Sequence, residues 1–260
     1  MSGKKPLSGA TIFEVRDVSF AYEGKHTALD RVSLAIQEQE ASVILGANGS
    51  GKSTLLKLLD GLYFPGSGSI TAFGAPLTEE ALRDDAYSMA FRRRVGLVFQ
   101  DSDVQLFMPS VLEEVAFAPL QLGLPRAEVS QRVDSALEAL RIEGLRDRAP
   151  HHLSGGEKRR VALASLLTLQ PDVWLMDEPS AGLDPRSQSW LIEFIAQQRQ
   201  LGKTMITATH DLSLAEEIAS TLFVFSEDHQ IVARGTPEEI LADHDLLHRC
   251  NLYHYHVRSH

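Results

Sequence analysis

The chain has 260 residues, 43% of them hydrophobic, which is enough to bury one large core or a core with an attached lobe. Its 35 acidic and 25 basic residues give a formal charge of −10, which argues against wholesale nucleic-acid binding, since such proteins present a basic face. The single cysteine, Cys250, excludes an internal disulfide and is typical of a reducing compartment.

Charge runs and apolar runs are both short. The basic runs at 92–94 and 158–160 are more typical of a solvated face or a strand flank than of a phosphate-binding stripe. No stretch has the ~18 apolar residues of a membrane span, because the best candidate, 161–176, is interrupted at 170–172. The first six residues are not followed by the apolar core of a signal peptide. We expect any membrane role to be that of a peripheral subunit.

The N-terminal part predicts two kinds of sheet. Stretches 11–15, 18–22 and 32–36 roughly alternate in polarity around a turn at Gly24, which indicates an antiparallel β flap. An apolar run at 43–45 then stops at a glycine and is followed by a helical pattern over 52–60. Strand, glycine loop and helix in that order predict the entry to a parallel α/β core.

Residues 46–53 match the P-loop pattern in full, after that strand and before that helix. Its glycines let successive N–H groups converge on a β-phosphate. Lys52 would neutralise β- and γ-phosphate oxygens, and the Ser53 hydroxyl would bind Mg²⁺. The sequence therefore predicts nucleotide binding.

The middle of the chain, from about 105 to 160, is mostly helical in pattern and reads as an inserted lobe. Near its end, residues 153–157 read Leu-Ser-Gly-Gly-Glu at the start of a helix. Ser154 with Glu157 three residues later fits an ordinary capping box. The same segment also offers a hydroxyl and unpaired N–H groups to an anion at the positive end of the helix. Taken alone, these two readings are about equally supported.

Buried-strand patterns return at 173–176 and 204–208, with a helix-like stretch at 188–201 between them. Such alternation indicates right-handed crossovers in a mostly parallel sheet. Residues 222–225 and 231–233 look like a hairpin. A helix should follow with Thr236 as its N-cap.

The strand at 173–176 brings two carboxylates, Asp177 and Glu178, to its carboxyl end, where ligands of open α/β sheets bind. Asp177 would hold Mg²⁺ through water, and Glu178 would polarise an attacking water. An exposed turn would explain one carboxylate, but not a pair followed by Pro179 and Ser180.

These motifs, in this order, make the chain resemble the ATP-binding subunit of an ABC transporter over nearly its whole length. Residues 153–157 match the signature of that family, which often ends in Gln rather than Glu. Gln100, after 96–99, resembles the Q-loop glutamine, and Asp184, in 181–184, belongs to a stretch resembling the D-loop. His210 resembles the switch histidine.

Tyr22 stands where the family places an aromatic that stacks on adenine, although a strand aromatic that packs on the core is the alternative. Gln100 and His210, taken singly, could be a polar strand end and a core histidine. Together with the P-loop and the signature, they imply one nucleotide site. Its candidate nucleotide-binding residues are Tyr22, Gly46, Ala47, Asn48, Gly49, Ser50, Gly51, Lys52, Ser53, Thr54, Ser154, Gly155, Gly156, Glu157 and Asp184.

The resemblance implies a P-loop ATPase core with a mostly parallel sheet, an antiparallel flap and a helical lobe. It would form one domain over 1–260, with its core at 11–104 and 161–240, an insertion at 105–160 and a His-rich tail at 244–260. ATP and Mg²⁺ are the implied cofactors, and a second ATPase subunit, identical or related, would complete the site. The implied catalytic residues are Lys52, Gln100, Glu178 and His210, and the implied Mg²⁺ residues are Ser53, Gln100 and Asp177.

Residues 101–107 and 110–117 resemble the energy-coupling-factor importers, which take up cobalt, nickel and vitamins. A membrane subunit would dock near Gln100, Glu113 and Glu114, which places the chain at the cytoplasmic face of the membrane; an exposed acid pair is the alternative for the two glutamates. Five of the ten histidines lie in the tail, and clustered imidazoles suit Ni²⁺, Co²⁺ or Zn²⁺. The five are His244, His248, His254, His256 and His260.

Two other classes of protein compete with this hypothesis. A soluble single-cassette ATPase for cofactor assembly has the same motifs but no membrane partner. A P-loop kinase or GTPase would leave residues 153–157 unexplained. Within the importer hypothesis, the alternative cargo is a vitamin or another small solute.

Overall fold

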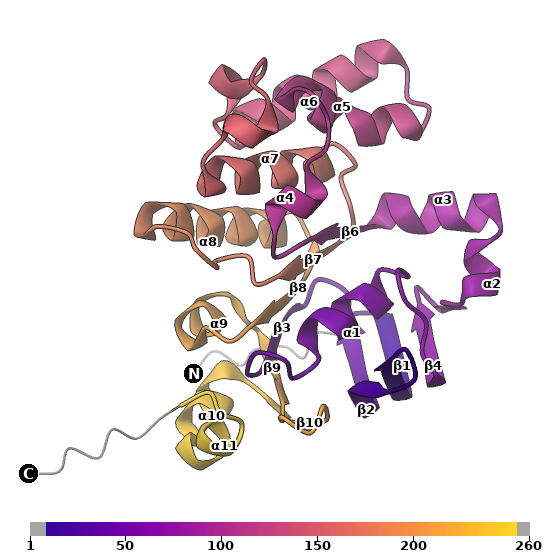
Figure 1. Ribbon diagram of the computed structural model, residues 1–260, viewed down its shortest axis with the longest axis vertical. Helices are drawn as coiled ribbons and strands as arrows, with labels where there is room; N and C mark the ends of the chain where they lie inside the picture. Colours follow the sequence, from indigo (N-terminus) through magenta and orange to yellow (C-terminus); the bar gives the residue numbers. More distant parts are fainter. Residues whose placement is uncertain (1–8, 254–260) are drawn as a thin grey trace, which may run out of the picture.

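The computed structural model describes residues 9–253, which form two β-sheets with helices between and around them (Figure 1). The smaller sheet has four strands in the order β2-β1-β4-β5, all antiparallel, and is the predicted flap. Its strands are β1 (Thr11–Tyr22), β2 (His26–Gln37), β4 (Ser67–Ala72) and β5 (Ala75–Pro76).

The larger sheet has six strands in the order β10-β9-β3-β8-β7-β6. All neighbours pair in parallel except β10 with β9, which form the predicted hairpin. The bounds are β3 (Ala41–Leu45), β6 (Val95–Val98), β7 (Val173–Asp177), β8 (Thr204–Thr209), β9 (Thr221–Phe225) and β10 (Ile231–Gly235). The α/β class with a mostly parallel sheet is thereby confirmed.

Strand β1 is one continuous strand where the polarity pattern indicated two. At Asp17 the backbone has a φ of 48°, and its N–H donates to the Ser33 hydroxyl at 2.8 Å. The register of β1 against β2 shifts between Val15 and Val18. Such a bulge interrupts the two-residue alternation of side chains without ending the strand.

Helices cover both faces of the larger sheet and build a lobe at the top of Figure 1. Two short 3₁₀ turns, Glu143–Leu145 and Pro150–His152, join α6 to α7. The helices are α1 (Lys52–Leu59), α2 (Glu79–Leu82), α3 (Asp85–Arg94), α4 (Ser102–Gln105), α5 (Val111–Gln121), α6 (Arg126–Ala139), α7 (Gly155–Leu167), α8 (Pro185–Gln200), α9 (Leu212–Ile218), α10 (Pro237–Ala242) and α11 (His244–Arg249).

Two hydrophobic layers fix the larger sheet in place. On one face, leucines of α1 pack between that sheet and the inner face of the flap. On the other face, α7 and α8 cover the sheet, and α5 and α6 pack on α7. Helix α7 continues the helical region past residue 160 to Leu167, so it belongs to the lobe and to the core at once. One continuous helix thus connects the signature to the sheet.

Within residues 9–253, no helix has both the length and the apolar character needed to cross a membrane. The same residues contain no group of three or more His, Cys, Asp or Glu side chains arranged to bind a metal ion. His244 and His248 lie on α11, whereas His254, His256 and His260 fall outside the described residues.

Asp60 follows the last residue of α1, at the negative end of the helix dipole. Burial raises the pKa of its carboxyl to about 7, against an opposing effect of Arg92. The folded chain therefore binds this proton more tightly than the unfolded chain, and the free energy of unfolding falls as pH rises from about 4 to 7.

Asp60→Asn removes this ionisation. We expect the free energy of unfolding to increase by about 1–3 kcal/mol at pH 8, and to change little at pH 4, because Asp60 is protonated there in the folded chain. Urea unfolding at both pH values measures the difference. Asp228→Asn, in the exposed turn after β9, is the matched control. An equal change at both pH values would contradict the role of the charge.

Candidate functional site

The P-loop follows β3, whose five residues are all buried, and leads into α1. Gly49 and Gly51 have φ values of 83° and 111°, a region that favours glycine. A Cβ on Gly51 would lie 2.2 Å from the Ala28 carbonyl oxygen, so no larger residue fits. From the β9–β10 turn, His229 Nδ1 donates to the Ser50 carbonyl at 3.2 Å. The flap and the hairpin therefore shape the loop from two sides.

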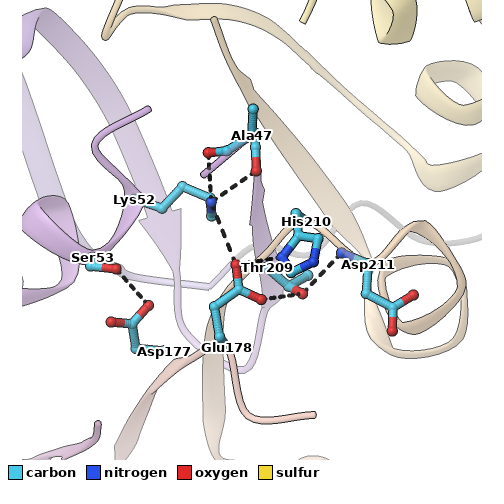
Figure 2. Close-up of polar contacts among 9 residues, drawn as sticks. Ala47, Lys52, Ser53, Asp177, Glu178, Thr209, His210 and Asp211 are labelled. Carbon is cyan, nitrogen blue, oxygen red and sulfur yellow. Dashed lines mark hydrogen bonds and ion pairs between the residues drawn. The ribbon is translucent and has the colours of Figure 1, made fainter. Parts of the chain in front are cut away.

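Lys52 is 4% exposed, and its ammonium group lies within this loop. Its Nζ donates to the carbonyl oxygens of Gly46 at 2.8 Å and Ala47 at 3.0 Å, and lies 3.5 Å from Glu178 Oε1 (Figure 2). Burial lowers the pKa of Lys52, while the Glu178 carboxylate opposes that shift. The result is a buried cation placed to meet an anion at the loop.

Ser53 lies at the start of α1, and Asp177 is the last residue of β7. The Ser53 hydroxyl donates a hydrogen bond to Asp177 Oδ1 at 2.8 Å (Figure 2). Burial raises the pKa of Asp177, and the hydrogen bond from Ser53 opposes this effect. A hydroxyl and a carboxylate side by side are oxygen ligands of the kind that Mg²⁺ prefers. The hydroxyl of Ser50 in the loop is buried without a partner among the described residues. These donors fit a Mg²⁺–nucleotide.

Glu178 lies just beyond β7 with a φ of 42°, unusual for a residue other than glycine. Its N–H donates to the Ala208 carbonyl at 2.8 Å, which fixes the turn against β8. The side chain is buried, with 3% of the residue exposed. Strain of this kind persists only where neighbouring structure enforces it, and it often accompanies functional sites.

Both oxygens of the Glu178 carboxylate have partners at the end of β8 (Figure 2). Thr209 donates its hydroxyl to Oε2 at 3.0 Å, and His210 Nδ1 lies 3.0 Å from Oε1. The Asp211 N–H in turn donates to Thr209 Oγ1 at 3.1 Å, which orients the hydroxyl. The carboxylate is thereby fixed in one orientation, with Lys52 beside it, and can act as an acceptor for a water proton.

Thr209 is a part of this site that the sequence reasoning missed. It is completely buried, and its position just before His210 at a strand end was the available signal. His210 is different, since about half of its side chain is exposed. His210 can therefore contact a ligand while it remains bonded to Glu178.

The segment after β6 carries Gln100, whose side chain is exposed and makes no hydrogen bond within residues 9–253. The carbonyls of Phe99 and Gln100 each accept a hydrogen bond from the guanidinium of Arg159 on α7. Arg159 is only 4% exposed, so the expectation of a solvated basic face at 158–160 is wrong for this residue. The run at 92–94 is exposed as expected.

Tyr22 ends β1 and is half-buried at the edge of the P-loop helix. Its hydroxyl lies 3.0 Å from Thr54 Oγ1, at hydrogen-bond distance. Its ring meets those of Phe20 and Tyr63 edge to face. The aromatic packing and a position beside the P-loop occur together, so the two readings of Tyr22 are compatible.

Ser154 is the N-cap of α7, and the capping box predicted with Glu157 is present. The Ser154 hydroxyl and N–H both donate to Glu157 Oε2, at 2.7 and 2.8 Å. These bonds lower the pKa of Glu157. A Cβ on Gly156 would lie 3.2 Å from Ser187 Oγ of α8, so the signature is close to the helix that Asp184 caps. Capping and an exposed N-terminus therefore coexist here.

The predicted acid pair on α5 divides into two environments. Glu113 is exposed, whereas Glu114 is 4% exposed. Glu114 Oε2 accepts from the N–H groups of Phe107 and Met108, both at 2.8 Å. Its carboxylate therefore caps the preceding loop within the chain. The prediction that both glutamates are exposed is wrong for Glu114, and so is the prediction that its carboxylate contacts a membrane subunit.

Comparison with known proteins places these features in one family. Residues 29–181 match the family described as ABC transporter. The nickel import ATP-binding protein NikO of Rhodobacter capsulatus is 49% identical over 243 residues, covering 92% of this chain and 95% of that protein. The energy-coupling factor transporter ATP-binding protein EcfA of Methanoculleus marisnigri is 40% identical, covering 93% and 85%.

Among solved structures, cbiO1 of Clostridium perfringens superposes with a TM-score of 0.78 at 36% identity, covering 93% of this chain and 95% of that one. It is described as part of the ABC transporter complex cbiONQ. The similarity therefore extends over the flap, the sheet and the helical lobe together.

Thr209→Val keeps the shape of the side chain and removes the hydroxyl bonded to Glu178. We expect kcat for ATP hydrolysis to fall about 10-fold, because the carboxylate loses its fixed orientation, with little change in KM. Steady-state ATPase assays measure both constants.

Thr207→Val is the matched control, since that hydroxyl is buried on the same strand and has no partner in the described part of the chain. It should leave kcat unchanged and unfolding no easier. Equal losses of kcat in the two variants would show that Thr209 acts only through strand packing.

Proposed function

This chain belongs to the ABC transporter family of ATP-hydrolysing subunits, and we propose that it powers an importer of the energy-coupling-factor type for a transition metal ion such as nickel or cobalt. The main support for ATP hydrolysis is the environment of Glu178. Glu178 is buried with both oxygens bonded, beside Lys52 and the Ser53–Asp177 pair. This arrangement suits the attack of water on a phosphate bound at the P-loop.

In the proposed reaction, Lys52 binds the β- and γ-phosphate oxygens and the N–H groups of the P-loop surround the β-phosphate. Glu178 accepts the proton of the attacking water, and the exposed face of His210 contacts the γ-phosphate. Tyr22 stacks on the adenine. Mg²⁺, when bound, would be held by Ser53, Gln100 and Asp177 and would neutralise charge on the phosphates.

A second ATPase subunit is proposed to complete the site. Ser154 and Gly155 are exposed at the N-terminus of α7, and nothing lies within 4 Å of a Cβ placed on Gly155. No hydrogen bond joins this signature to the P-loop within residues 9–253. A head-to-tail pair would bring the signature of each subunit to the phosphates of the other, with Asp184 near the shared boundary.

The membrane subunit is proposed to bind where apolar side chains are exposed beside Gln100. Val104 is 72% and Phe107 is 65% exposed, and the Phe107 ring packs against Phe117 of α5 with centroids 5.1 Å apart. Glu113 adds an exposed carboxylate on the same helix. An apolar patch with an acidic edge fits an amphipathic segment that carries basic residues. The chain would then lie on the cytoplasmic face of the membrane.

The cargo is inferred from relatives. The named function of NikO is nickel import, and EcfA is named for an energy-coupling factor transporter. The histidines at 244–260 add chemistry suited to the same metals. A vitamin or other small solute is the alternative cargo, and a cofactor-assembly ATPase is the alternative class.

Glu178→Gln keeps the size of the side chain and removes the proton acceptor. We expect kcat to fall about 10²- to 10⁴-fold and an ATP-bound dimer to accumulate, because hydrolysis no longer releases it. Size-exclusion chromatography with and without ATP measures the dimer, and a Lys52→Ala double variant, unable to bind the phosphates, is the control. Hydrolysis at the parent rate would contradict the role of Glu178.

The importer assignment is tested in cells that lack this chain. Wild-type protein should restore uptake of radioactive Ni²⁺ or Co²⁺ and be recovered with membranes, whereas Phe107→Asp should lose both while the purified variant keeps its ATPase activity. Leu201→Asp, an exposed leucine at the end of α8, is the matched control. Membrane recovery without metal uptake would favour another solute. Wild-type protein absent from membranes would favour the cofactor-assembly ATPase.

A further inference from the structure

Arg159 is a buried cation whose charged group contacts the backbone of another segment. It lies in the second turn of α7 and is 4% exposed. Its Nη1 donates to the Phe99 carbonyl and its Nη2 to the Gln100 carbonyl, both at 2.5 Å. The planar guanidinium thus spans two successive backbone carbonyls of the segment that follows β6, with one of its terminal nitrogens directed at each.

The charge state of Arg159 matters to this contact. Burial lowers the pKa of the guanidinium, while the nearby carboxylates of Asp101 and Asp177 oppose that shift. An arginine nevertheless stays protonated in proteins, and hydrogen bonds from a charged donor are roughly twice as strong as neutral ones. Removal of Arg159 would leave two carbonyls without their donor.

Further contacts show that the whole segment, and not one residue, is joined to α7. Lys158 Nζ contacts Asp103 Oδ1 at 2.5 Å, next to Arg159 on the helix. Within the segment, the Phe99 N–H donates to Gln105 Oε1 at 3.2 Å. The exposed Asp103 makes the Lys158 pair the weaker link, since surface ion pairs contribute about 0–1 kcal/mol. Arg159 is the main connection.

Arg159 also lies where three functional segments meet. A cleft of about 360 Å³ is lined by Gln100, by Gly155 and Arg159 of the signature helix, and by Gly182 of the loop after β7. The backbone of Gln100 is fixed at the edge of this cleft, while its side chain remains exposed. A contact to the backbone sets where that side chain can reach without occupying its amide.

We propose that Arg159 is a positioning residue for Gln100, fixing its backbone to α7 so that its side chain reaches the phosphate site. The inference rests on the role of Gln100 in the proposed function. It adds that Arg159 is the main contact joining the Gln100 segment to the helix that begins with the signature.

The first test needs no nucleotide. Hydrogen exchange of the purified chain should show amides at 99–105 exchanging at least about 10-fold faster in Arg159→Met, with the P-loop at 46–53 unchanged. Arg160→Met is the matched control, because Arg160 stacks on Trp190 at 4.8 Å and is on the same helix. The proposal would be overturned if exchange became faster throughout the chain, or if the exchange rate at 99–105 did not increase.

The second test is a double-mutant cycle on the ATPase activity of the isolated chain. Arg159→Met should lower kcat about 10-fold, and should have almost no further effect when combined with Gln100→Ala, because the group it positions is already absent. Effects that multiply would show a merely structural role and overturn the inference. Arg160→Met should multiply with Gln100→Ala or have no effect.

Should Arg159→Met fail to fold, Arg159→Gln keeps a polar side chain but removes both the charge and the guanidinium group. It must then show the faster exchange at 99–105 and the lower kcat, and wild-type behaviour would overturn the proposal. A Gln100→Ala variant with normal kcat would instead refute the role proposed for Gln100, and the inference with it. Since none of these assays contains a membrane subunit, failure of the importer assignment is a separate outcome.

Discussion

The buried carboxylate of Glu178 constrains the architecture around it. A charge taken out of water costs several kcal/mol unless hydrogen bonds and an opposite charge compensate. Here the compensating groups come from two other strand ends: Lys52 follows β3, and Thr209 and His210 lie at the end of β8. The site exists only while these strands are neighbours in register, which the parallel pairing of β3 with β8 and of β8 with β7 provides.

The sheet order also explains why motifs distant in sequence meet. Parallel strands with crossovers bring their carboxyl ends to one edge, so β3 and β7 place the P-loop and the acidic pair side by side although more than a hundred residues separate them. The flap closes α1 from the other side. Side chains facing this edge are polar, while both layers beneath it are apolar.

Much of this could be predicted from the sequence, and what could not has a physical cause. Strands with uniform burial, the P-loop and the Thr236 cap depend on local pattern, and all were found where expected. The burial of Arg159 and Glu114 was not foreseen, because a charged side chain within a polar stretch looks solvated until its backbone partners are known. The role of Thr209 was not predicted, because its hydroxyl at the end of β8 contacts Glu178, which follows a different strand, β7.

The capping box at the start of α7 gives Ser154 an internal competitor. A serine hydroxyl carries one proton, and here that proton goes to Glu157 Oε2 at 2.7 Å. In the proposed head-to-tail pair, a phosphate bound by the other subunit would compete with this carboxylate for the hydrogen bond of the Ser154 hydroxyl. The affinity of this helix end for the phosphate would then depend on how strongly each of the two acceptors binds the Ser154 hydroxyl. A stronger hydrogen bond to Glu157 would weaken phosphate binding, whatever the helix dipole contributes.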